Sequence, residues 1–217
     1  MVRNVLCMSC GRKGFTLIEL LVSIGVMMII LGVSISGAPQ AVTKLALADN
    51  AYQVELLLRE VQLQGSSVNS FDGLYGGAGV FFDLATSSKV LKFKDRVIPS
   101  FTHAVGIGNG LYDAGPTDEQ SDLLVMTGSN RFSKLCVATS TSVLKCNTAN
   151  VPMIRTLTLS FNRPKQTVHI YINGDASIDY TLACMQFDSY RSPENGHVRS
   201  IFVYKSGMIT KKFGTCS

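Results

Sequence analysis

The chain has 217 residues, of which 46% are hydrophobic and 16% are charged. This composition excludes a disordered chain, a collagen-like chain and a highly charged coiled coil. The net charge is +5, and Arg3, Arg12 and Lys13 account for three of these charges. So small a surplus does not by itself indicate a protein that binds nucleic acid.

The first predicted element is an apolar stretch that follows the basic N-terminal segment. No charged residue lies between Leu20 and Thr43, and a helix needs about 20 apolar residues to cross a bilayer. Because the basic residues come first, we expect the N-terminus in the cytoplasm and the rest of the chain outside. Glu19 lies just inside this stretch, where a carboxylate is costly unless it has a partner. The alternative is that Glu19 lies at the membrane interface and is tolerated there.

The residues from Gly14 to Val22 read GFTLIELLV. This segment resembles the N-terminal signature of type IV pilins and type II secretion pseudopilins, in which prepilin peptidase cleaves after the glycine. The resemblance implies cleavage between Gly14 and Phe15 and N-methylation of Phe15. It also implies that Glu19, the fifth residue of the mature chain, pairs with the charged amine of a neighbouring subunit's Phe15. Such a pair would offset the cost of a buried carboxylate.

A secretory signal peptide is the rival interpretation of the same segment. Ser36, Gly37 and Ala38 are small enough to precede a cleavage site, but Pro39 would follow the cut. The apolar stretch is also longer than the usual core of about 7–15 residues. The leader contains Cys7 and Cys10, a spacing that suggests zinc or redox chemistry. No second such pair follows, so two thiols in a discarded leader are favoured.

An amphipathic helix is predicted over 40–64, continuous with the membrane helix or kinked from it at Gly37-Ala38-Pro39. Apolar residues recur there at intervals of four and three, which is typical of one buried helix face. That face is formed by Leu47, Ala51, Val54, Leu58 and Val61. We expect it to pack on a β-sheet.

From Ser66 onward, short β-rich runs alternate with turn residues and no further long helix is predicted. Candidate strands are 80–84, 90–97, 123–127, 134–138, 142–145, 155–161, 167–172, 178–187, 198–205 and 208–213. Asn173-Gly174-Asp175 and Lys205-Ser206-Gly207 are predicted hairpin turns. The expected fold class is α+β, with a long N-terminal helix packed on an antiparallel, sandwich-like β-domain.

The predicted organisation has four parts. These are a cleaved cytoplasmic leader (1–14), a transmembrane and assembly helix (15–38), an amphipathic continuation (39–65) and an exported β-rich domain (66–217). A long helix before a β-rich domain resembles the H-type minor pseudopilins. Three local segments are similar to that subgroup: Ala51–Glu60, Leu159–Pro164 and Val198–Val203.

Four cysteines remain after the leader, and an exported domain favours disulfides. Cys136 and Cys146 flank a short turn, which favours a bridge across a hairpin, and Cys184 and Cys216 would then pair. Spacing alone leaves three connectivities open, and free core thiols are the alternative. Asp113, Asp118, Glu119 and Asp122 lack calcium-loop spacing and are more typical of a solvated acidic loop. No cofactor or metal is predicted, and His103, His169 and His197 are scattered.

The leading hypothesis is a minor pilin-like structural subunit of a type II secretion pseudopilus or a type IV pilus. The resemblance implies other pilin or pseudopilin subunits, prepilin peptidase and an inner-membrane assembly platform as partners. It implies a single-pass inner-membrane location with an outside domain, followed by assembly into a filament. The alternative is a DNA-binding minor pilin of a DNA-uptake pilus, with Arg199, Lys211 and Lys212 as contacts. An exported, tethered enzyme has no supporting motif.

Overall fold

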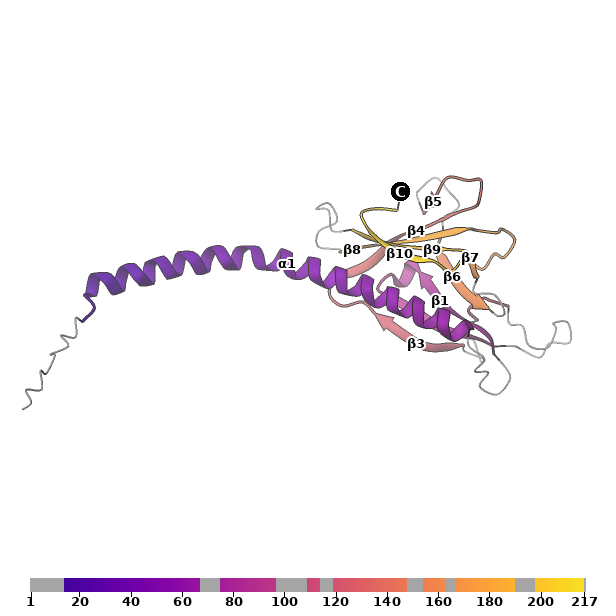
Figure 1. The fold of residues 1–217 in the computed structure, drawn as a ribbon, viewed down its shortest axis with the longest axis horizontal. Coiled ribbons are helices and arrows are strands. Elements are labelled where there is room, and N and C mark those ends of the chain that lie inside the picture. The colour runs from indigo at the N-terminus through magenta and orange to yellow at the C-terminus, as the bar shows by residue number, and fades with distance from the viewer. Residues whose placement is uncertain are drawn as a thin grey trace, which may run out of the picture. The chain divides into compact units, whose positions relative to one another are not determined.

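The computed structural model describes residues 14–66, 75–96, 109–113, 119–147, 154–162, 167–189 and 198–216. The chain divides into two compact units, Met1–Val42 and Thr43–Ser217. One helix, α1 (Leu17–Ser66), contributes its first part to one unit and its second part to the other (Figure 1). The helix predicted over 40–64 therefore lies within a longer element, which continues through Gly37-Ala38-Pro39 as helix.

The second unit contains two antiparallel sheets of five strands each. Sheet A has the strand order β3-β2-β1-β6-β7, with the bounds β3 Gln120–Val125, β2 Lys89–Arg96, β1 Tyr75–Asp83, β6 Thr156–Asn162 and β7 Val168–Ile172. Sheet B has the order β10-β9-β8-β4-β5, with the bounds β10 Ile209–Phe213, β9 Arg199–Tyr204, β8 Leu182–Ser189, β4 Asn130–Ala138 and β5 Lys145–Cys146. A short 3-10 helix, η1 (Leu84–Thr86), joins β1 to β2. The predicted α+β fold with an antiparallel sandwich-like domain is confirmed.

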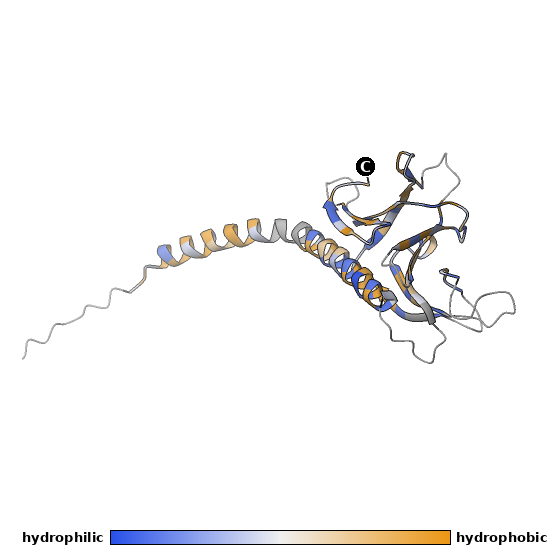
Figure 2. Ribbon diagram, turned by 45° about the vertical axis from the view of Figure 1, so that its right-hand side comes forward, coloured by the Kyte–Doolittle hydropathy of each residue, from blue (hydrophilic) through white to orange (hydrophobic). Residues whose placement is uncertain are grey.

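The core lies between the inner faces of the two sheets and the second part of α1. It includes Val54, Leu58 and Val61 of α1, all completely buried. Phe82 of sheet A meets Phe132 of sheet B edge-to-face, with ring centroids 5.6 Å apart. Figure 2 shows the change along α1, from an almost wholly apolar first part to a second part with mixed apolar and polar residues. The second part uses its periodic apolar face to close the core.

Polar contacts fix α1 to both sheets as well. Asn50 is buried, and its amide accepts from the N–H of Thr127 at 3.1 Å and donates to the Thr127 carbonyl at 3.0 Å. On sheet A, the Nζ of Lys92 lies 2.5 Å from Glu60 Oε1. On the side of sheet B, the Nζ of Lys211 lies 2.9 Å from Glu55 Oε2. The helix is therefore held by directional contacts in addition to apolar packing.

Two predicted turns have different outcomes. The turn at 205–207 joins β9 to β10, where the N–H of Tyr204 donates to the Met208 carbonyl, as predicted for a hairpin. At 173–175, Asn173 and Gly174 take positive φ values of 51° and 74°, as a tight hairpin turn requires. However, only Asp175 bridges back to Ile172, and the next strand, β8, belongs to sheet B. The predicted turn is therefore present, but the prediction that it joins two paired strands as a hairpin is wrong.

Two predicted strands are shorter than expected. The strand predicted over 178–187 begins only at Leu182. The strand predicted over 142–145 reduces to β5, because Ser142 belongs to the preceding turn and its Oγ accepts from the N–H of Thr139 at 3.0 Å. Hydroxyl residues that bond their own turn in this way compete with strand pairing.

Candidate functional site

The start of α1 is built from a helix cap. Thr16 precedes the helix, and its Oγ1 accepts from the Glu19 N–H at 3.3 Å while its carbonyl accepts from the N–H groups of Glu19 and Leu20. Glu19 lies in the first helical turn, where its negative charge interacts favourably with the positive end of the helix dipole. A threonine followed three residues later by glutamate is the sequence pattern of a capping box. Sequence analysis overlooked this contribution of Thr16 and Glu19 to starting the helix.

Gly14 and Phe15 lie just before this cap. Nothing comes within 4 Å of a Cβ placed on Gly14, and its φ is outside the left-handed region. Phe15 is 79% exposed. The fold of this chain therefore gives no steric reason for a glycine at position 14. A requirement for glycine there is better explained by a binding partner than by the chain's own packing.

The segment that follows is apolar and exposed. Leu17–Ser34 has a mean hydropathy of 2.4 and none of it is buried, and it is the one helix segment among the described residues long and apolar enough to cross a membrane. Its two hydroxyls are satisfied within the helix, since Ser23 Oγ donates to the Leu20 carbonyl and Ser34 Oγ to the Ile30 carbonyl. A helix that satisfies its own polar groups suits a lipid environment.

Comparison with known families gives one match, to the prokaryotic N-terminal methylation motif, over residues 10–35. The chain carries the type IV pilin and pseudopilin signature. This signature supports a type IV pilin-like protein that prepilin peptidase processes, and it implies assembly with other pilins. Together with the one apolar N-terminal helix, it fits a single-pass, membrane-anchored protein. Neither a curated protein nor a solved structure gives a significant match to the chain.

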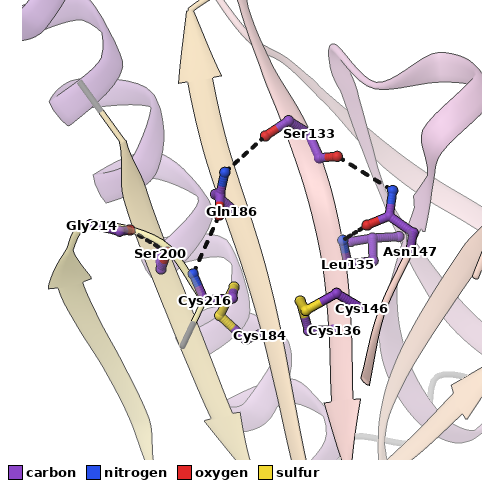
Figure 3. The surroundings of a disulfide bond; sticks show 10 residues. All are labelled: Ser133, Leu135, Cys136, Cys146, Asn147, Cys184, Gln186, Ser200, Gly214 and Cys216. Carbon is purple, nitrogen blue, oxygen red and sulfur yellow. Dashed lines mark hydrogen bonds between the residues drawn. A yellow bond between two sulfur atoms is a disulfide. The ribbon is translucent and has the colours of Figure 1, made fainter. Parts of the chain in front are cut away.

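Both predicted cysteine pairs lie on the outer face of sheet B, the face opposite the core (Figure 3). The structure contains the disulfides Cys136–Cys146 and Cys184–Cys216, the pairs favoured above. Cys136 and Cys184 are direct partners in the β4–β8 register, so the two disulfides lie side by side. They form a small cluster with Phe202, separate from the main core.

The second disulfide holds the C-terminal tail against β8. Gln186 Oε1 accepts from the Cys216 N–H at 3.3 Å, and Ser200 Oγ donates to the Gly214 carbonyl at 2.6 Å (Figure 3). The first disulfide is flanked by Asn147, whose Oδ1 accepts from the Leu135 N–H at 3.0 Å. The first disulfide thus joins the edge strand β5 to β4 within sheet B, and the second attaches the C-terminal tail to β8.

The three C-terminal bases do not share one face of sheet B, because Arg199 and Lys211 lie on one face and Lys212 lies on the other. Lys211 and Lys212 are consecutive on β10, so they point to opposite faces of sheet B. Lys211 pairs with Glu55 and lies 5.1 Å from the ring centroid of Tyr52, whereas Lys212 lies 4.9 Å from that of Phe202. Arg199 stacks on Phe213 at 3.7 Å. Each predicted DNA-contacting base already makes its own local contact.

Sequence analysis missed a buried carboxylate on the outer face of sheet A. Asp95 of β2 is completely buried, and its Oδ2 accepts from the Gly110 N–H at 2.8 Å. Its Oδ1 has no hydrogen-bond partner among the described residues. Burial, reinforced by the charge of Asp113, raises the pKa of Asp95 to about 6, although N–H groups of Gly110 and Asn109 oppose the shift.

The acidic loop predicted around residues 113–122 is partly wrong. Glu119 is 4% exposed and its Oε2 accepts from the Asp113 N–H at 3.1 Å, so this carboxylate is buried and structural. Asp122 is exposed, and Asp118 lies outside the described residues. No cluster of three potential metal ligands occurs in the described part of the chain. His169 stacks beside Tyr171 on β7, while His103 and His197 fall outside the described residues.

Proposed function

We propose that the chain is a minor pilin-like structural subunit of a type II secretion pseudopilus or a type IV pilus. The observation that carries this proposal is the methylation motif, which coincides with the capped start of an exposed apolar helix. Prepilin peptidase would remove residues 1–14, and Phe15 would become the methylated N-terminus. Methylation keeps the positive charge of an amine, so it leaves a cation for Glu19 of a neighbouring subunit to pair with.

The proposed topology places the leader in the cytoplasm, residues 15–38 in the inner membrane and the remainder outside. Two features support it. Arg3, Arg12 and Lys13 precede the apolar span, as the positive-inside rule requires of the cytoplasmic side. The domain contains two disulfides, which persist in oxidising compartments. Residues 39–65 would continue the helix into the domain 66–217, and an inner-membrane platform would assemble the subunits.

The DNA-binding alternative gains no support from side-chain positions. Binding to a nucleic-acid backbone calls for cations presented together along one surface. Lys211 is instead paired with Glu55 on one side of sheet B, and Lys212 lies over Phe202 on the other. The structural role is therefore the one we propose.

The test is N-terminal sequencing and intact mass of the membrane-extracted protein, with and without prepilin peptidase. We expect a chain that begins at N-methyl-Phe15 only when the peptidase is present. Gly14→Leu is the matched variant, because position 14 has room for a side chain in this fold. It should block cleavage while leaving both disulfides formed. A chain that begins near Pro39 in the presence of the peptidase would instead mean a signal peptide and would refute the proposal.

A further inference from the structure

Three of the four disulfide-bonded cysteines lie in one row across sheet B. Cys136 of β4 is the direct register partner of Cys146 in β5 on one side and of Cys184 in β8 on the other. Direct partners on neighbouring antiparallel strands point to the same face of a sheet. Cys136 therefore has a cysteine neighbour on each side at the same level of the sheet, although it is bonded to only one of them.

The unbonded pair, Cys136 and Cys184, has the spacing that a disulfide requires. Direct partners of an antiparallel pair have Cα atoms about 4.5–5.5 Å apart, and disulfides join Cα atoms about 4.4–6.8 Å apart. Figure 3 shows the two existing bridges on neighbouring strands of sheet B. A bridge between Cys136 and Cys184 can thus form without separating β4 from β8. Its formation would leave Cys146 and Cys216 without their present partners.

The four cysteines differ in their access to solvent. Cys136 and Cys184 are completely buried, and Cys216 is 8% exposed. Cys146 is half-buried and lies on β5, a strand of two residues at the edge of sheet B. Thiol–disulfide exchange begins when a thiolate reaches one sulfur of a disulfide, so access selects the sulfur that is attacked. In this cluster an external thiolate reaches Cys146 first.

We propose that the four cysteines form a thiol–disulfide exchange site, in which Cys136 passes an attack at Cys146 on to Cys184. In the first step an external thiolate bonds to Cys146 Sγ, the Cys136–Cys146 bond breaks, and its electron pair leaves on Cys136 Sγ. In the second step the Cys136 thiolate bonds to Cys184 Sγ, and the Cys184–Cys216 bond breaks. Cys216 Sγ leaves as a thiolate and takes a proton from water.

These two steps balance without an oxidant or a further reductant. Two disulfides are present at the start. Two are present at the end, one between Cys136 and Cys184 and one between Cys146 and the external sulfur. The second step also moves the negative charge from the completely buried Cys136 to Cys216, which is 8% exposed. Burial in apolar surroundings disfavours a thiolate, so this transfer of charge is favourable.

Exchange changes what holds the C-terminal tail. Cys216 attaches the tail to β8, and Phe202 is only 4% exposed in the cluster that the cysteines form around it. After exchange the tail keeps its non-covalent contacts, which include hydrogen bonds from the Cys216 N–H to Gln186 and from Ser200 to the Gly214 carbonyl. One attack at the sheet edge thereby ends the covalent attachment of both β5 and the tail. This chemistry does not depend on the proposed assembly into a filament.

The test compares two full-length variants that lack the same disulfide but keep different thiols. Cys146→Ala leaves the Cys136 thiol beside Cys184, whereas Cys136→Ala leaves the Cys146 thiol on the far side of β4. Neighbouring strands lie about 4.8 Å apart, so Cys146 is two strand spacings from Cys184. Every chain also carries Cys7→Ser and Cys10→Ser, so that the four cysteines of the domain supply the only thiols. Each folded chain is incubated in detergent with iodoacetamide, and its disulfides are mapped by mass spectrometry after proteolysis.

In the Cys146→Ala chain we expect alkylated Cys216 together with a Cys136–Cys184 bridge, because alkylation traps the thiol that exchange releases. The Cys136→Ala chain should instead keep Cys184–Cys216 and carry the alkyl group on Cys146. Alkylation of Cys216 should therefore be severalfold faster in the first variant. Alkylated Cys136 with an intact Cys184–Cys216 bridge would overturn the proposal. A Cys136–Cys184 bridge that joins two chains, visible as a dimer on a non-reducing gel, would overturn it as well.

The chain that keeps all four cysteines of the domain provides a second test, which needs no broken disulfide at the start. Brief treatment with reduced glutathione, followed by alkylation, should give glutathione on Cys146, a Cys136–Cys184 bridge and an alkyl group on Cys216. Glutathione on Cys146 with alkylated Cys136 at every time point would overturn the onward transfer. Glutathione found first on Cys216, or on neither sulfur, would overturn entry at Cys146.

Discussion

The outer faces of the two sheets are covered in different ways. On sheet B, the Cys184–Cys216 disulfide attaches the C-terminal tail to β8, and beside it Cys136–Cys146 ties the edge strand β5 to β4. On sheet A, the segment 109–113 is held by a hydrogen bond from Gly110 to Asp95 and by Tyr112, whose ring contacts Phe81 and Phe93. Stability should therefore depend on redox conditions at one sheet and on pH at the other.

The largest expected effect comes from removing the covalent cover. Cys184→Ala with Cys216→Ala opens a bridge that spans 32 residues, whereas Cys136–Cys146 spans 10. The chain-entropy model gives losses of about 3.7 kcal/mol for the longer bridge and about 2.8 kcal/mol for the shorter one. Chemical denaturation of the full chain in detergent measures both. Equal losses would show that strain or packing, not loop length, sets the contribution of each bridge.

The next effect concerns the titratable contact on sheet A. The folded-state pKa of Asp95, about 6, exceeds the ordinary value of 3.8 for an aspartate, so the folded state binds the proton more tightly. The resulting stabilisation is fully present below pH 3.8 and is lost as the pH rises through about 6. Asp95→Asn removes this dependence, because an amide keeps an acceptor for Gly110 without a charge.

The free energy of unfolding of the native chain, relative to Asp95→Asn, should therefore fall between pH 4 and pH 6.5 by about 2–3 kcal/mol. Denaturation at several pH values measures the difference. Asp122→Asn is the matched control, because Asp122 is an exposed carboxylate on the neighbouring strand β3. Parallel pH profiles for the native chain and Asp95→Asn would show that burial does not perturb Asp95.

These two faces also show what the sequence allows one to predict. Alternating apolar residues located the strands, and the short turn between Cys136 and Cys146 favoured their pairing. Asp95 was missed because it lies in a run of charged residues, Lys94-Asp95-Arg96, that is typical of a solvent-facing strand end. It is buried because residues 109–113, distant in sequence, lie over it. No local pattern specifies which loop covers a sheet face.

The side of α1 opposite the core, where Leu45, Tyr52, Leu56 and Leu63 are exposed, illustrates a different reason. The spacing of these residues is visible in the sequence, but a helix with apolar residues at so many positions offers several faces that could be buried. Choosing among them requires knowing which side meets the sheets, and contacts such as Asn50 with Thr127 decide that. The motif from Gly14 to Glu19, in contrast, is local and needs no tertiary information.

The smallest expected effect concerns the attachment of α1 beside sheet B. Burial raises the pKa of Glu55, but hydrogen bonds and charges of Lys211 and Arg59 outweigh it and leave the pKa below its ordinary value. The stabilisation by Glu55 is thus present above its unfolded pKa of 4.5 and is lost as the pH falls through the lower folded value. This dependence is opposite in sign to that of Asp95.

Since both cationic partners of Glu55 are partly exposed, Glu55→Gln should cost only about 0.5–1 kcal/mol at neutral pH. Adding Asp95→Asn should leave this loss unchanged. Asp95 contacts Gly110 at sheet A, whereas Glu55 contacts Lys211 of sheet B, and the two carboxylates share no partner among the described residues. Denaturation of the two single variants and the double variant measures the coupling. A coupling energy above about 0.5 kcal/mol would show that the attachment of α1 and the cover of sheet A do not act independently.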